Sequence, residues 1–306
     1  MPKWCGALVA AALAGTILLA QNSPLRDNTP FRSGVDLISV TATVVDHDGH
    51  LVTGLPREAF ELYEDGERQT ITQFTNERVP VSMAILLDVS DSMFGQRIQD
   101  ARTAVERFLF DLLDPTDEFC LLAFNHQPRI LTRWTRVPAE VRGALDALRP
   151  SGATAIYDAL LTALPLMESR SQQRASILII SDGADTASDA GLRDVRSALL
   201  RSDAFAYAIA IDPPARRAIN EPVNPAALTE ITSGSGGRTL LVHDTADLMT
   251  ATSSIADELN KQYVLGYSSS RAPDGRYHSI RVHVPPEYRV RARNGYVATP
   301  RRGTKR

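Results

Sequence analysis

Lysine is nearly absent from this chain of 306 residues. Of its 33 basic residues only Lys3, Lys261 and Lys305 are lysine, and all the others are arginine. The formal net charge of −3 leaves no basic field, which excludes a general nucleic-acid binder. An enzyme working on phosphate would lack in residues 81–258 the lysine that commonly stabilises phosphate charge, although arginine can take that role.

Cysteine is equally scarce, because the chain holds only Cys5 and Cys120. If the first twenty residues are removed, the single remaining thiol cannot form an intramolecular disulfide, and the fold must be stable without one. Cys120 lies in an apolar, strand-like run. We therefore predict a buried small hydrophobic residue there rather than a nucleophile.

Long apolar runs are missing after residue 20. Before it, Lys3 precedes an uncharged stretch over residues 4–20, and a polar, turn-prone break follows from Gln21 to Pro24. This pattern is typical of a secretory signal, so we predict a signal peptide over 1–20 and an exported, periplasmic or secreted protein. The alternative is an uncleaved membrane anchor through residues 4–20, which the poor cleavage residue Leu18 keeps open.

The central part of the chain alternates between buried strands and helices. Continuous apolar runs such as 83–87, 119–124 and 177–180 are typical of strands covered on both faces, and helical periodicity follows them. We expect Pro165 to shorten its helix. The pattern predicts an α/β domain over 79–258, with a doubly wound, mainly parallel, Rossmann-like sheet.

Both ends of the chain show strand patterns instead. Residues 35–78 contain alternating apolar positions and a hairpin signal, with strands at 61–63 and 71–74 around Asp65-Gly66. Residues 261–298 contain further strands, followed by a basic tail over 299–306 that we expect to be solvated. We predict that 35–78 and 261–298 fold together as an accessory β-sandwich around the α/β domain.

Three polar clusters follow predicted strands of the α/β domain, on the edge where such sheets bind ligands. They contribute Asp88, Ser90 and Ser92, then Thr154, then Asp182. Their oxygen atoms are the hard donors that Mg²⁺ prefers. Each cluster alone fits an ordinary helix cap or turn, whereas the conjunction favours a cation site.

The order Asp88-x-Ser90-x-Ser92, Thr154 and Asp182-Gly183 resembles the metal-ion-dependent adhesion site of von Willebrand factor type A domains. The resemblance implies a divalent cation, Mg²⁺ by preference with Mn²⁺ or Ca²⁺ as alternatives. It also implies that the serines and the threonine bind the ion largely directly, while Asp88 and Asp182 often act through water. The partner it implies is a protein that completes the coordination with an acidic residue.

The flanking segments extend this resemblance to a bacterial subfamily abundant in Acidobacteria. The residues that carry it lie at Leu55–Gly66, Gln69–Phe74, Tyr263–Tyr267 and Arg291–Tyr296. It covers about residues 35–298 and implies a fold and a site without naming a partner. A membrane contact is expected only if the amino-terminal segment stays uncleaved.

Two other functions remain open from the sequence. A Mg²⁺-dependent phosphatase also places an aspartate at a strand tip, but it generally needs a second carboxylate at position 90, where this chain has serine. The chain also lacks a nucleophile elbow and a phosphate loop, so we expect no enzyme. In the second alternative the protein is an envelope scaffold, with a purely structural ion and the sandwich as its binding surface.

Overall fold

A six-stranded sheet forms the centre of the α/β region. The computed structural model describes residues 36–182, 185–211, 225–271 and 273–299, so the expected signal segment and almost all of the basic tail lie outside it. The strand order is β10-β9-β8-β5-β6-β7, and every neighbouring pair is parallel except β6 and β7. The bounds are β5 Val81–Asp88, β6 Glu118–Phe124, β7 Pro128–Thr135, β8 Arg174–Ser181, β9 Phe205–Ile211 and β10 Thr239–Val242.

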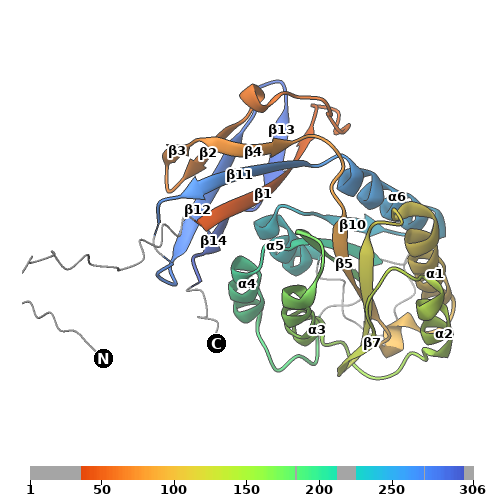
Figure 1. The fold of residues 1–306 in the computed structure, drawn as a ribbon. Coiled ribbons are helices and arrows are strands. Elements are labelled where there is room, and N and C mark those ends of the chain that lie inside the picture. Colours follow the sequence, from red (N-terminus) through yellow and green to blue (C-terminus); the bar gives the residue numbers. More distant parts are fainter. Residues whose placement is uncertain (1–35, 183–184, 212–224, 272, 300–306) are drawn as a thin grey trace, which may run out of the picture. The chain divides into compact units, whose positions relative to one another are not determined.

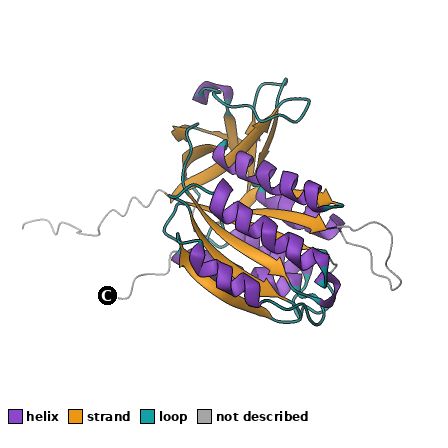
Figure 2. Ribbon diagram, turned by 90° about the vertical axis from the view of Figure 1, so that its right-hand side faces the viewer, coloured by secondary structure: helices purple, strands orange, loops and turns teal. Residues whose placement is uncertain are grey.

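Helices cover both faces of this sheet, which explains why its central strands are apolar throughout. Side chains of α1 (Gln96–Arg107), α2 (Ala139–Ala147) and α6 (Thr245–Asn260) share one buried cluster with one face. Side chains of α3 (Ile156–Ala163), α4 (Leu192–Arg201) and α5 (Pro225–Ser235) pack on the other (Figure 1). In Figure 2, helices lie in front of the strands of this sheet. The doubly wound, mainly parallel sheet predicted from the sequence is confirmed.

Short helical turns lie between the longer elements, with η1 in the amino-terminal flank and the others in the α/β region. α3 stops at Ala163 and continues as the 3-10 helix η4 (Leu164–Ser169), whose early Pro165 cannot donate an α-helical hydrogen bond. The other turns are η1 Arg57–Ala59, η2 Asp91–Met93 and the π-helical η3 Phe108–Leu112.

Cys120 in β6 is fully buried, and burial raises the pKa of its thiol to about 12. The thiol is therefore an inert core group, as predicted.

The two ends of the chain meet in two four-stranded sheets, ordered β13-β1-β11-β4 and β14-β12-β2-β3. Apolar side chains of both sheets enter one buried cluster that includes Val40, Leu62, Leu265 and Ile280. The strands are β1 Asp36–Val45, β2 Glu61–Glu64, β3 Glu67–Gln69, β4 Ile71–Thr75, β11 Tyr263–Ser269, β12 Tyr277–His283, β13 Arg289–Ala292 and β14 Gly295–Val297. The expected accessory β-sandwich of both flanks is present (Figure 1).

The hairpin expected in the amino-terminal flank differs from the prediction. Asp65 and Gly66 both have positive φ, and the turn they form pairs β2 with β3. The residues expected as the second strand belong to β4, which pairs with β11 in the opposite sheet. The return strand β3 ends at Gln69, and the chain then crosses to the other sheet, where Ile71–Thr75 form β4.

A buried polar network joins α6 to the sandwich. Glu258 of α6 is fully buried and accepts hydrogen bonds from Thr43 Oγ1 at 3.1 Å and Tyr207 Oη at 2.8 Å. Its Oε2 also lies 3.0 Å from Arg238 Nε and 2.7 Å from Arg291 Nη2. One carboxylate thus meets two hydroxyls and two guanidinium groups.

Within the part of the chain that is described, no helix is long and apolar enough to span a bilayer.

Candidate metal centre

Two carboxylates lie side by side at the carboxyl edge of the central sheet. Asp88 ends β5, and Asp182 follows the last residue of β8. These strands are parallel neighbours, with Leu87 opposite Ile180, so the topology brings together two residues that lie far apart in sequence. Both aspartates are fully buried.

Hydroxyl groups connect the two carboxylates. The backbone N–H of Ser90 donates to Asp88 Oδ1 at 2.8 Å, which folds the loop after β5 back on its own aspartate. Ser90 Oγ lies 2.9 Å from Ser92 Oγ, and Ser92 Oγ donates to Asp182 Oδ1 at 2.5 Å. Four of the five residues expected at the site therefore form one continuous chain of polar contacts.

Thr154, the fifth expected residue, lies in the adjoining loop. Its carbonyl accepts from the N–H groups of Thr186 at 2.8 Å and Ala187 at 3.0 Å. The same loop is tied to the segment after β5, because Asp91 N donates to Gly152 O at 2.8 Å. Among the described residues, no hydrogen bond joins the Thr154 hydroxyl to the other four, although the side chain is buried. The loop thus holds Thr154 near the site without fixing its hydroxyl.

The donor set fits a divalent cation. Burial raises the pKa of Asp88 to about 6, and the neighbouring charge of Asp182 acts in the same direction. Hydrogen bonds from Ser181 and Ser90 oppose this shift. A cation placed between two buried carboxylates would relieve both the desolvation and the mutual repulsion, and the hydroxyls add oxygen donors without charge.

Two contributors were not among the expected site residues. Ser181 Oγ donates to Asp88 Oδ2 at 2.5 Å. Arg97 of α1 makes an ion pair with Asp182, at 2.6 Å between Nη1 and Oδ2, and also donates to Ser92 O at 2.5 Å. Ser181 could have been found as the last residue of a strand beside β5. Nothing in the local sequence around Arg97 indicates its partner, because Asp182 lies 85 residues away.

Asp185, in the same polar cluster as Asp182, has a structural role instead. Its Oδ2 accepts from Tyr157 N at 2.9 Å and from Ser188 Oγ at 2.6 Å. Tyr157 lies in the first turn of α3, where backbone N–H groups have no partner within the helix. Asp185 therefore caps α3.

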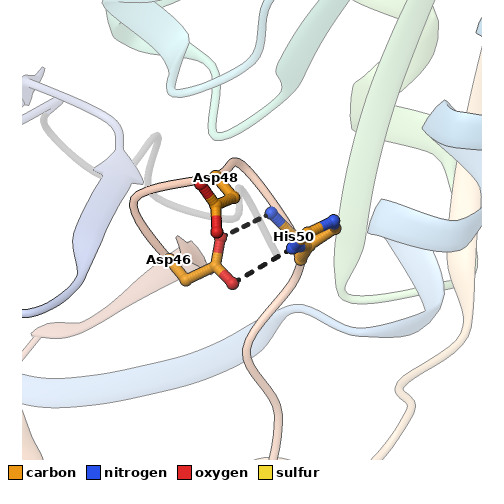
Figure 3. A group of neighbouring side chains, drawn as sticks. All are labelled: Asp46, Asp48 and His50. Atoms are coloured by element: carbon orange, nitrogen blue, oxygen red, sulfur yellow. Dashed lines mark hydrogen bonds and ion pairs between the residues drawn. The ribbon is translucent and has the colours of Figure 1, made fainter.

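A second group of possible ligands lies in the sandwich, in the turn after β1. Asp46, Asp48 and His50 each bring a ligand atom within 4.8 Å of the others (Figure 3). His50 N donates to Asp46 Oδ1 at 2.8 Å, and its Nδ1 lies 3.2 Å from Asp46 Oδ2. His50 and Asp48 are exposed, and the contacts between His50 and Asp46 are those that close a turn.

The α/β region matches a known family. Residues 83–184 fit the family model described as the von Willebrand factor type A domain. Residues 83–184 thus belong to a von Willebrand factor type A domain. The match begins within β5 and ends just after Asp182, so it contains all five residues of the proposed site.

Curated proteins are similar to part of the chain. Human inter-alpha-trypsin inhibitor heavy chain H4 is 26% identical over 184 residues, which are 55% of this chain and 19% of that protein. An uncharacterized protein of Synechocystis sp. is 28% identical over 117 residues, 37% of this chain and 28% of its own length. The chain thus spans less than a third of either relative.

Solved structures show the same fold at low sequence identity. A von Willebrand factor type A protein from Catenulispora acidiphila has a TM-score of 0.52 at 13% identity, covering 88% of this chain and 73% of its own. Proximal thread matrix protein 1 from the mussel byssus has a TM-score of 0.51 at 17% identity, covering 64% of this chain and 51% of its own. The match to the first structure extends well beyond the type A domain.

Proposed function

We propose that this protein is an exported binding protein whose type A domain makes a cation-dependent contact with another protein. The observation that carries the proposal is the polar chain from Asp88 through Ser90 and Ser92 to Asp182, which holds two buried carboxylates at one edge of the sheet. Two buried carboxylates at this spacing are costly unless positive charge lies beside them, and Arg97 supplies only one such charge.

Asp88, Ser90, Ser92, Thr154 and Asp182 would hold the ion, which we propose to be Mg²⁺. When bound, the ion offers an electrophilic position to an oxygen ligand of the partner. Three of the five proposed ligands are uncharged hydroxyls. The two carboxylates can therefore balance the two charges of the ion but leave no excess of negative charge around it. An acidic residue of a partner protein would therefore be attracted to it, as expected from the resemblance to adhesion-type domains.

The rim of the site is suited to a protein partner. Ser92 is exposed although the carboxylates it joins are buried, so the site opens to solvent on its side. Phe94, two residues further on, is 78% exposed, which is unusual for a large apolar side chain. A partner that places a carboxylate at the ion would cover Phe94 and bury apolar area in the same step.

The remaining parts of the chain receive proposed roles from the sequence. We assign 79–258 to the type A domain, and 35–78 with 261–298 to a sandwich that serves as spacer or second contact surface. Residues 1–20 would direct export, and residues 299–306 would form a solvated tail. We also propose, from the resemblance of the flanks, that the protein belongs to the bacterial subfamily abundant in Acidobacteria.

Partner capture with and without chelator tests the proposal. Tagged protein lacking residues 1–20 is incubated with envelope extract in Mg²⁺ or in EDTA, and captured proteins are identified. We expect capture in Mg²⁺ to be lost in EDTA, in Asp88→Ala and in Ser90→Ala. Asp48→Asn is the matched control, because it removes an exposed carboxylate from the other group of possible ligands. Capture that survives both EDTA and Asp88→Ala would refute the proposed contact.

The same variants separate binding from catalysis. Turnover of a generic phosphate ester should be absent in Mg²⁺, since position 90 is serine and the type A domain contains no lysine. Mg²⁺-dependent turnover that disappears in Asp88→Asn would instead identify a phosphatase. A scaffold with a purely structural ion would keep its partner when Ser92 is changed and lose it only when the sandwich surface is altered.

A further inference from the structure

A surface cavity of about 540 Å³ adjoins the proposed cation site within the type A domain. It lies between the carboxyl-terminal end of α2 and the β6–β7 connection with the start of β7, and α2 packs against β7. Its lining includes Asn125, His126, Arg129, Arg149 and Ser151. In Figure 1, β7 and α2 lie at the same end of the central sheet.

One side-chain and two backbone hydrogen bonds join this cavity to the loop that carries the proposed ligands. Asn125 Nδ2 donates to Ser151 O at 2.8 Å, and Ser151 N donates to Val89 O at 2.8 Å. Val89 lies between Asp88 and Ser90. Asn125 O also accepts from Ala155 N at 2.7 Å, directly after Thr154. The cavity wall and the cation site are therefore parts of one connected loop cluster.

The cavity has a one-sided charge. Its lining contains Arg129, Arg149 and His126 but no aspartate or glutamate. Among the described residues, neither arginine has a carboxylate oxygen within ion-pair distance. Arg149 Nη1 donates only to the backbone carbonyls of Asp146 and Leu148, both at 2.7 Å. Both guanidinium groups are exposed and can bind an added carboxylate with charge-assisted hydrogen bonds.

We propose that the partner segment carries two acidic residues, one completing the cation site and a second bound by Arg129 and Arg149 in this cavity. The proposal rests on the proposed function for its first carboxylate, and on the charge of the cavity for its second. An extended segment advances about 3.3 Å per residue, so acidic residues a few positions apart reach neighbouring sites on one surface. The occupant is therefore an acidic protein segment.

The test uses blocked glycine peptides with two glutamates separated by one to four glycines, and versions in which either glutamate is replaced by glutamine. Binding is followed by NMR titration into the millimolar range, in Mg²⁺ and in EDTA. At the best spacing, we expect the two-acid peptide to bind about tenfold more tightly than either single-acid peptide. The Arg129→Gln/Arg149→Gln double variant should lose this gain and keep Mg²⁺-dependent binding of single-acid peptides.

Arg133→Gln is the matched control, because Arg133 is an exposed arginine on the same strand β7 outside the cavity. Its variant should retain the full gain. If single-acid peptides bind with Mg²⁺ but the second glutamate adds nothing, or if the gain survives in the double variant, this inference fails and the proposed function stands. If no peptide shows Mg²⁺-dependent binding, both fail. Tighter binding of a sulfated oligosaccharide than of any two-acid peptide would also overturn the inference.

Discussion

Two buried acidic regions of this molecule differ in how their charge is balanced. At the junction with the sandwich, the single carboxylate of Glu258 faces two guanidinium groups, those of Arg238 and Arg291. At the carboxyl edge of the central sheet, two carboxylates face one guanidinium, that of Arg97. The first region has an excess of positive charge and the second an excess of negative charge.

This difference separates a structural acid from a candidate binding site. Glu258 receives all its partners from distant parts of the same chain, including Thr43, Tyr207 and Arg291. It has no need of a ligand. Asp88 and Asp182 instead accept hydrogen bonds mainly from the hydroxyls of Ser181 and Ser92. Ser92 is exposed, so their site is open to solvent on that side. Both regions are buried, so burial alone does not distinguish them, and the balance of charge is what makes Asp88 and Asp182 the candidate site.

Removal of the Glu258 carboxylate should have the largest effect on stability. Glu258→Ala leaves two arginines and two hydroxyls without their common partner. Loss of one member of a buried ion pair typically costs about 3–5 kcal/mol. Urea unfolding should show this loss equally in Mg²⁺ and in EDTA. The exposed Glu287→Ala serves as control and should change the free energy of unfolding by less than about 0.5 kcal/mol. A Glu258→Ala cost below about 1 kcal/mol would contradict the structural role.

Cation binding should have the next largest effect on stability, and this effect should depend on the region of Asp88 and Asp182 alone. Mg²⁺ at a hundredfold excess over its dissociation constant should stabilise the wild-type protein by about 2.7 kcal/mol. Asp88→Ala and Asp182→Ala should abolish this gain, whereas Asp48→Asn should keep it. Thermal unfolding with increasing Mg²⁺ measures the effect. An equal shift in wild type and Asp88→Ala would place the cation elsewhere.

The dependence on pH should follow the raised pKa of Asp88, which is about 6. A carboxyl whose pKa is raised by folding favours the folded state when protonated, so stability without metal should fall as pH rises from about 4 through 6. The cation needs the ionised form. The affinity for Mg²⁺ should therefore be close to its maximum at pH 7.5 and about tenfold weaker at pH 5. A Mg²⁺ affinity that is constant over this range would exclude Asp88 as a ligand.

Arg97 should have the smallest effect, in the opposite direction. Its guanidinium occupies Asp182 Oδ2 and places a positive charge beside the cation site. Arg97→Gln should tighten Mg²⁺ binding about fivefold, or about 1 kcal/mol, because partly exposed charges repel only modestly. Isothermal titration measures it, with Arg102→Gln on the same helix as control. Weaker binding in Arg97→Gln would mean that the arginine positions Asp182 instead.

The sequence was sufficient to predict the elements whose burial is uniform. β5, β6 and β8 are buried at every position and read as continuous apolar runs. β7 was not predicted, because it is an antiparallel edge strand with exposed positions such as Arg129 and Ile130. Its sequence shows neither an apolar run nor a clean alternation. The hairpin of the amino-terminal flank failed for a related reason, since the alternation in 71–74 cannot specify which sheet receives the strand.

The part of the candidate site that depends on the spacing of residues close together in the sequence could be predicted. The spacing of Asp88, Ser90 and Ser92 and their place after a buried strand are local properties. They predicted a cluster of polar side chains at the sheet edge, and the structure brings these side chains together there. The ion pair between Arg97 and Asp182 and the hydrogen bond from Ser181 to Asp88 depend on how the strands are ordered. No spacing rule reports these contacts, because they join segments about 85 and 93 residues apart.

The place of β1 in its sheet also constrains how the chain is built. β1 precedes the type A domain in the chain, yet its only strand partners in the described structure are β11 and β13, which follow that domain. Until residues 263–292 emerge, both edges of β1 lack a partner and can pair with other chains. The type A domain contains no such delay, because its strands pair among themselves. We therefore expect the sandwich to close last, after the domain between its halves has folded, and any chain cut short after α6 to expose an adhesive strand.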